Sequence, residues 1–427
     1  MAGDRPLALC TALLAAVTLL PLFVTPFLPL ADLPAHTAQG ALLPSILFES
    51  RSLAAYHYQI QWVPVPYWTT HIVIALLSPI VGALAAAKIM VGGVVIGLPL
   101  AVMRVLIALR RDPRLGLWAF LMSWDHNVYA GWIAYMLGMV LALWAVAWLL
   151  ESQGPRQAVR VGVFACVVGV THVQAVAYLG LICVFLLMVR RPFKQALLTH
   201  AVACSGFGVS VVPWLVQRWH KTPAGAKVPF TFDFSPLAER VEGLFRFTLD
   251  NQPKPNETLL TGTAFLLLLF GVPLLASLPQ GGGDSQDESR ASEVPHAATA
   301  PILLITPLLL YLLLPMSIGG PIAHWYTYPR YATFAVVSLL FLPRARFLGA
   351  QALWLLPGVL GALACQASVV AQFADFARRT RPFLEIIAHV RPNSAYLPLE
   401  LNDSDPATKL PPLNQIHSYI AAVKHGY

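Results

Sequence analysis

Long apolar runs alternate with short polar segments along the whole chain. Apolar stretches of about 18 or more residues are typical of transmembrane helices. The pattern therefore predicts an all-α polytopic membrane protein with about eleven spans. The predicted spans are 7–29, 67–83, 86–107, 115–127, 130–150, 161–188, 197–217, 258–278, 300–317, 331–343 and 347–369.

The basic residues beside these runs predict an orientation. Arg5 precedes the first run, which is too long for a signal peptide and reads as an uncleaved span, so we expect a cytoplasmic N-terminus. An odd number of spans then places the C-terminus outside. The basic segment 110–114 (RRDPR) also falls outside, against the positive-inside tendency. Either 67–107 is not two full spans, or a short basic loop is tolerated there.

Three segments with polar content are expected on the exterior side: 31–66, 218–256 and 370–427. The polar stretch 280–299 is expected to be a cytoplasmic linker. This gives a transmembrane domain over 1–369 and a small extracytoplasmic segment over 370–427. In that segment the sequence predicts a short strand with a turn, followed by a short closing helix.

Composition agrees with a membrane location. The chain of 427 residues is 57% hydrophobic and 11% charged, whereas about a quarter of the residues in a soluble domain are charged. The net charge of +8 does not indicate a nucleic-acid partner, because the basic residues cluster at the ends of apolar runs. The five cysteines lie in apolar runs without metal-ligand spacing, and we interpret them as buried small hydrophobes.

The first exterior loop contains the main candidate for chemistry. Asp32-Leu33-Pro34 is a favourable helix start, and the residues that follow predict a short amphipathic helix on the membrane surface. Asp32 and His36 are four residues apart and share a face. Asp32 can simply cap this helix and pair with His36. Alternatively, its carboxylate can deprotonate a hydroxyl group at the membrane edge, with His36 tuning its pKa.

This arrangement resembles the GT-C superfamily, the multi-span glycosyltransferases that use polyprenyl-phosphate-linked sugars. More closely, it resembles bacterial members whose first exterior loop opens with Asp-x-Pro-x-His. The resemblance implies that Asp32 is the catalytic base and that the protein lies in the bacterial inner membrane. No second acid adjoins Asp32, unlike the pattern of protein O-mannosyltransferases, which disfavours a protein acceptor.

Three further stretches carry the resemblance. Residues 85–111 (AAAKIMVGGVVIGLPLAVMRVLIALRR) are similar to the family's third span, and residues 123–143 (SWDHNVYAGWIAYMLGMVLAL) to its broken Asn…Gly-aromatic element. Residues 171–175 (THVQA) resemble its mid-membrane histidine segment. With the small exterior tail, the resemblance covers nearly the whole chain.

Other polar residues interrupt apolar stretches. Asp125 and His126 either face a cavity within the membrane or lie in a surface loop between two helices. If the break is inside the membrane, Asp125 needs His126 or Arg330 as a partner. His172 indicates either a cavity lining or a hydrogen-bonded core histidine.

The aromatic segment 319–334 contains His324 and Arg330, and Trp62 and Trp68 lie near the end of the first loop. Arg330 can bind a lipid-linked phosphate through its guanidinium fork. The aromatic residues can contact a sugar ring. Both groups can also form an ordinary aromatic belt at the membrane interface.

The sequence therefore predicts a membrane glycosyltransferase that takes a sugar from a polyprenyl-phosphate lipid. The alternatives are a non-catalytic GT-C-like protein that binds lipid-linked intermediates or serves as an assembly subunit, and a secondary transporter, for which a second broken helix is missing. The cofactor is unknown. A divalent metal is conceivable, but Asp32 and His36 alone do not make a ligand set.

Overall fold

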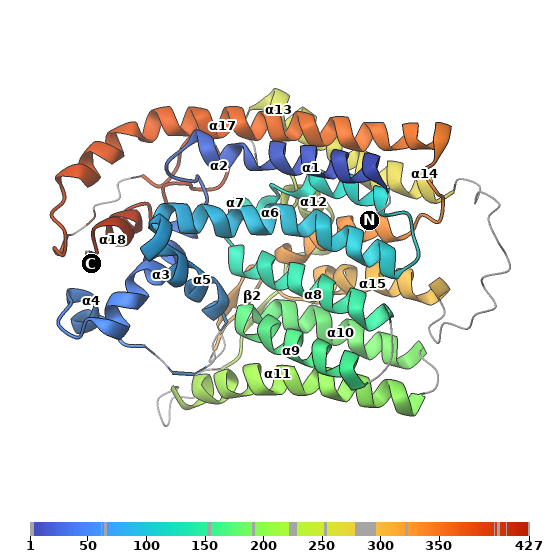
Figure 1. The fold of residues 1–427 in the computed structure, drawn as a ribbon, viewed down its shortest axis with the longest axis horizontal. Helices are drawn as coiled ribbons and strands as arrows, with labels where there is room; N and C mark the ends of the chain where they lie inside the picture. Colours follow the sequence, from blue (N-terminus) through green and yellow to red (C-terminus); the bar gives the residue numbers. More distant parts are fainter. Residues whose placement is uncertain are drawn as a thin grey trace.

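The fold comes from a computed structural model, which describes residues 4–425 except 61, 64–65, 152–154, 190–192, 222–228, 252–253, 278–295, 321–322, 397, 399–401 and 407. Most of the predicted linker 280–299 therefore lies outside the described residues. The long helices run side by side in one bundle, and the two chain ends lie at opposite ends of it (Figure 1). We call the end with the C-terminus the site end.

Six helices of the described chain are long and apolar enough to span a membrane: Arg5–Val24, Ala83–Ala108, Ile133–Glu151, His200–Gln217, Pro255–Ala276 and Gly349–His389. Each overlaps a predicted span. The elements of the bundle are α1 (Arg5–Leu19), α2 (Pro21–Val24), α6 (Ala83–Ala108), η1 (Pro113–Met122), α8 (Ile133–Glu151), α9 (Pro155–Thr171), α10 (Val173–Val189), α11 (Phe193–Lys221), α13 (Pro255–Leu266), η2 (Leu267–Gly271), α14 (Val272–Ala276), α15 (His296–Leu313), η4 (Pro329–Tyr331), α16 (Ala332–Val337), η5 (Ser338–Phe341), η6 (Gly349–Leu355) and α17 (Leu356–His389).

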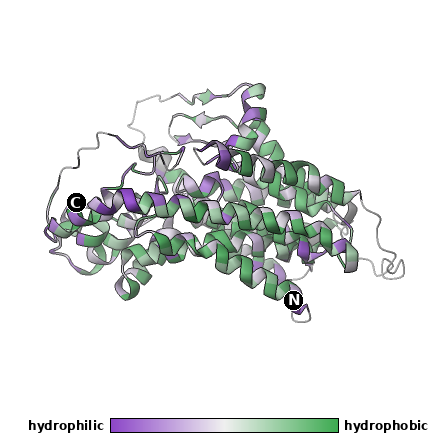
Figure 2. Ribbon diagram, turned by 90° about the horizontal axis from the view of Figure 1, so that it is seen from above, coloured by the Kyte–Doolittle hydropathy of each residue, from purple (hydrophilic) through white to green (hydrophobic). Residues whose placement is uncertain are grey.

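The remaining elements are α3 (Leu33–Phe48), α4 (Leu53–His57), α5 (Trp68–Val81), α7 (His126–Tyr129), β1 (Phe232–Asp233), α12 (Leu237–Arg246), β2 (Ser317–Ile318), β3 (His324–Trp325) and α18 (Ser418–Lys424). The strands form one antiparallel sheet in the order β1-β2-β3. Phe232 is opposite Ile318, and Ile318 is opposite His324. Figure 2 shows these strands standing out from the side of the bundle.

Four predicted spans differ from the structure. The range 331–343 is the six-residue α16 followed by the 3₁₀ helix η5. The range 115–127 is a 3₁₀ helix followed by the short α7. The range 161–188 is two helices that meet at His172. The range 67–83 is α5, which has 14 residues and at 1.5 Å per residue is shorter than the roughly 30 Å of bilayer hydrocarbon.

The short α5 accounts for the basic segment 110–114. Arg114 pairs with Asp4, so this segment lies at the same end of the bundle as the N-terminus. The span count placed 110–114 on the side opposite to the N-terminus, and this prediction is wrong. The structure agrees with the first alternative, that 67–107 is not two full spans.

The core of the bundle is apolar and continuous. It includes Val94, Leu98 and Leu106 of α6 and Met139 and Leu143 of α8, all nearly or fully inaccessible to solvent. Within a bilayer, contacts between such helices stabilise the bundle through van der Waals packing, because lipid tails are as apolar as the buried side chains.

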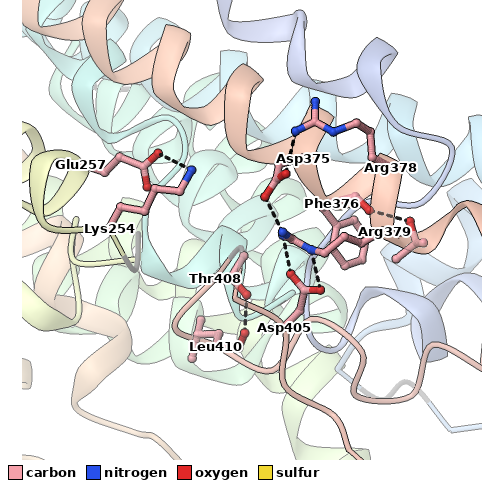
Figure 3. Close-up of polar contacts among 10 residues, drawn as sticks. Lys254, Glu257, Asp375, Phe376, Arg378, Arg379, Asp405, Thr408 and Leu410 are labelled. Carbon is pink, nitrogen blue, oxygen red and sulfur yellow. Dashed lines mark hydrogen bonds and ion pairs between the residues drawn. The ribbon is translucent and has the colours of Figure 1, made fainter.

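The C-terminal segment is attached to the bundle by the apolar packing of α18 and by charged groups. Helix α17 continues to His389, so the boundary predicted at 370 falls within a helix. Arg379 of α17 donates to Asp405 through Nε (3.1 Å) and Nη2 (2.8 Å), and it also binds Asp375 (Figure 3). Among the described residues of 391–417 no strand forms, whereas the predicted closing helix is present as α18.

Candidate functional site

Asp32 lies immediately before α3, where two distant parts of the chain meet. The amide groups of Ala31 and Asp32 donate to the carbonyl groups of Tyr129 and Ala130, at 3.0 and 3.2 Å. Gly131 follows with a φ of +76°, and a Cβ there would lie 2.5 Å from the Asp32 nitrogen. Glycine is therefore required for this close approach, which fixes the position of Asp32.

The carboxylate of Asp32 does not cap its own helix, since α3 has no side-chain cap hydrogen bond. The indole N–H of Trp132 donates to it, and the positive charge of Arg330 acts on it. Burial raises the pKa of Asp32 above its ordinary value, and the Arg330 charge and the Trp132 hydrogen bond oppose part of that rise. Asp32 is therefore a stronger base than a carboxylate in water.

A cavity of about 1550 Å³ opens beside Asp32. Its walls come from α3, α5, the segment 126–132, the end of α12, strand β3 and the C-terminal segment. The polar and aromatic residues of the wall are Asp32, Gln39, Tyr58, Gln59, Tyr67, Trp68, His71, His126, Trp132, Trp214, Gln217, Arg246, Phe247, Asp250, His324, Trp325, Tyr326, Arg330, Tyr396, Lys409, Asn414, His417 and Ser418. Aromatic faces and neutral polar groups thus outnumber charges.

Helix α3 differs from the amphipathic surface helix that the sequence predicts. The sequence puts Leu42, Leu43, Ile46 and Leu47 on the apolar side of this helix; the first three line the cavity, and Leu47 is exposed. Ala38, Ala41 and Leu42 also pack against Ala421 and Ala422 of α18. The predicted apolar stripe is therefore used partly for tertiary packing.

The expected pair between His36 and Asp32 does not form. The Nδ1 atom of His36 lies 3.1 Å from Nε2 of His71, and its ring stacks on Tyr67. Burial, with smaller contributions from His71 and Arg330, lowers the pKa of His36 to about 3. His36 is therefore neutral at physiological pH, and it supports the wall of the cavity next to Asp32.

Arg330 is buried at the centre of a polar and aromatic cluster. Its guanidinium lies 4.1 Å from the centre of the Trp132 ring and donates through Nη1 to His172 Nε2 at 3.1 Å. His324 lies near His172, with ring centres 5.9 Å apart. The Nε2 atom of His324 is buried, without a hydrogen-bond partner in the described part of the chain, on a residue that lines the cavity. A cation and an unused imidazole nitrogen thus lie on the same wall.

Asp125 and His126 occupy different surroundings. Asp125 is fully buried and does not line the cavity. It caps α7 by accepting from the Val128 amide at 3.0 Å, and Asn127 and the Thr333 hydroxyl also donate to it. The sequence predicted His126 or Arg330 as the side-chain partner of Asp125. Neither side chain forms a hydrogen bond with it. His126 lines the cavity, and its Nδ1 lies 3.1 Å from Asn251 Oδ1.

The two tryptophans of the first loop also separate. Trp68 lines the cavity, whereas Trp62 is exposed and lies outside it. Two further residues of the cavity wall, Trp132 and Lys409, were not predicted from the sequence. The Gly-aromatic pair at 131–132 was a signal for the first, but no local signal marks Lys409, which pairs with Asp250 across the cavity wall. Within the described ranges, no group of three or more His, Cys, Asp or Glu side chains is arranged to hold a metal ion.

No family model and no curated protein matches this chain. Among solved structures, the chain is similar to the arabinofuranosyltransferase AftD from mycobacteria, with a TM-score of 0.50 and 16% sequence identity. The similarity covers 91% of this chain and 29% of that chain, so this protein corresponds to less than a third of AftD. At this identity the similarity is one of fold, a mainly helical bundle in which six helices of the described residues are long and apolar enough to span a membrane.

Proposed function

We propose that this protein is a membrane glycosyltransferase that transfers a sugar from a polyprenyl-phosphate donor to an acceptor hydroxyl group at the site end of the bundle. The observation that carries the proposal is the position of Asp32. Its carboxylate has no bond to its own helix and lies on the wall of a large cavity with a buried arginine nearby.

In the proposed reaction Asp32 accepts the proton of the acceptor hydroxyl group. The acceptor oxygen forms a bond to the anomeric carbon of the sugar while the bond between that carbon and the phosphate oxygen breaks. The polyprenyl phosphate leaves with the bonding electrons. Its negative charge is stabilised by Arg330 and by a hydrogen bond from the free nitrogen of His324.

The surroundings of Asp32 suit a general base. Burial raises its pKa, so it takes up a proton more readily than an exposed carboxylate does. Arg330 keeps part of the carboxylate population charged by opposing that rise. The aromatic residues of the wall, such as Trp68 and Trp325, offer flat faces for sugar rings.

The test is Asp32→Asn in the purified protein, assayed for sugar transfer from polyprenyl-phosphate donors in nanodiscs. Asparagine keeps the size of the side chain and accepts from Trp132, but it cannot take up a proton. A general base contributes about two to four orders of magnitude in rate, so we expect turnover to fall by that factor with an unchanged melting temperature.

The matched control is Glu49→Gln, an exposed carboxylate just after the same helix, which should leave turnover unchanged. Full turnover in Asp32→Asn would end the assignment of the base. Donor binding without turnover in the parent protein would favour a non-catalytic scaffold.

A further inference from the structure

The exterior segment before α12 carries three phenylalanines at alternate positions, in the sequence PFTFDFSP. In extended chain, alternate side chains point to the same side. Phe230, Phe232 and Phe234 are 43%, 55% and 56% exposed. Their ring centres are 6.3 and 6.4 Å apart in sequence order, so the three rings form one exposed row. Such a row in water is unfavourable unless something covers it.

The exposed apolar surface continues along α12. Leu237 and Val241 are four residues apart, hence on one face, and are 65% and 68% exposed. Arg240 anchors a different face. Its Nη1 donates to the carbonyl groups of Tyr311, Leu312 and Leu314 at 2.8 to 3.0 Å, beside the C-terminal end of α15. The arginine therefore holds α12 with its apolar face outward.

The surface then joins a membrane-spanning helix. Phe245 of α12 lines an apolar groove of about 760 Å³ together with Leu259 and Leu266 of α13. Both leucines are exposed on Pro255–Ala276, a helix long and apolar enough to span a membrane. The apolar residues of this segment are thus continuous with the exposed apolar face of a candidate membrane span.

The same segment is joined to the cavity through the sheet. Strand β1 pairs with β2, and β2 pairs with β3. Trp325 of β3 lines the cavity, at the opposite edge of the sheet from Phe232. Figure 2 shows the strands standing out from the side of the bundle, and the sheet links Trp325 of the cavity wall to the outlying strand β1.

From these observations we propose that residues 230–245, the interfacial segment, lie in the headgroup boundary of the bilayer leaflet at the site end. The phenylalanine row and the outer face of α12 contact acyl chains there, as amphipathic surface helices do. The sheet then holds the Trp325 wall of the cavity at the level of the lipid headgroups, where a lipid-borne molecule reaches it from the side. This inference does not depend on the proposed glycosyl transfer.

The experiment uses the full chain in phosphatidylcholine nanodiscs, with p-benzoylphenylalanine introduced singly at Phe232 or Val241. Illumination attaches this residue to whatever lies against it, and mass spectrometry identifies the adduct. Phe270 is exposed on the candidate span Pro255–Ala276, so it serves as the control expected to contact lipid. Tyr56 of α4, also exposed, is the control outside the proposed surface.

We expect phosphatidylcholine adducts at 232 and 241 at a yield similar to that at 270, and well above that at 56. Phe232 and Val241 are both exposed, so each crosslinker variant should keep the melting temperature of the parent protein. This measurement excludes misfolding as the source of an adduct. Yields at 232 and 241 no higher than at 56 would overturn the proposal. So would a protein adduct in place of lipid when the same variants are illuminated in native membranes.

Discussion

Asp32 and Asp125 occupy the same local position, the residue before a helix, and their carboxylates do different things. Asp125 accepts from the amide of its own helix and from Asn127 and Thr333, so its oxygens are used within the core. Asp32 leaves the amides of α3 alone and faces the cavity. The comparison teaches that an aspartate at a helix start predicts the helix, whereas the availability of its oxygens is decided by tertiary neighbours.

The largest effect on stability is expected at Asp125. Replacement by alanine leaves the buried Thr333 hydroxyl without its acceptor and removes the hydrogen bonds that Asn127 and the Val128 amide donate to the carboxylate, which costs about 3 kcal/mol in all. Asp32→Ala loses the Trp132 hydrogen bond beside an open cavity and should cost less. Thermal unfolding of both variants in one detergent measures the difference. Equal losses for the two variants would break the comparison between a structural and a functional carboxylate.

Much of the fold could be predicted from the sequence because apolar run length is a local property. The six long spans, the helix start at Asp32 and the closing helix at 418–424 all follow from residues near one another in the chain. The prediction of one continuous span over 115–127 and another over 161–188 is wrong. Hydropathy does not distinguish a 3₁₀ segment, or two helices meeting at His172, from one continuous span.

The site was predictable only in part, for the same reason. Asp32, Arg330, His324 and Trp68 were named from residue type, and the structure brings all four to one cavity. Their partners come from distant positions: Trp132 bonds to Asp32 from about a hundred residues away, and Lys409 reaches Asp250 from the C-terminal segment. His36 shows the opposite case. Its spacing predicted Asp32 as partner, but His71 of α5 lies at 3.1 Å instead.

The positive charge of Arg330 acts on Asp32, so replacing Arg330 tests whether Asp32 is the functional carboxylate of the two. Arg330→Gln removes a charge-assisted contact to the proposed phosphate, worth about 2 kcal/mol or roughly a thirtyfold rise in the donor KM. It also removes the cation that lowers the pKa of Asp32, so that pKa rises further. A general base works deprotonated and loses activity as the pH falls through its pKa. The acid limb of the pH–rate profile should therefore move to higher pH.

Arg246→Gln is the control for this shift. Arg246 is an exposed cation on the wall of the same cavity, and it is not among the groups that act on Asp32. Its replacement should leave the acid limb in place. If the limb does not move in Arg330→Gln, or moves equally in both variants, Arg330 does not set the protonation of Asp32.

The smallest effect on stability is expected at the partly exposed aspartates Asp375 and Asp405, which form ion pairs on the surface. Arg379 binds Asp405 through two nitrogens and also binds Asp375, whereas Arg378 binds Asp375 alone and is largely exposed (Figure 3). Exposed ion pairs contribute about 0.2 to 1 kcal/mol. Arg379→Ala should therefore lower the melting temperature slightly and Arg378→Ala not measurably, by thermal unfolding in the detergent used for Asp125→Ala.

A loss in Arg379→Ala as large as that in Asp125→Ala would mean that the C-terminal segment depends on this contact for its attachment to the bundle. The wall of the cavity that carries Lys409 would then be held by surface charge rather than by the packing of α18 against α3.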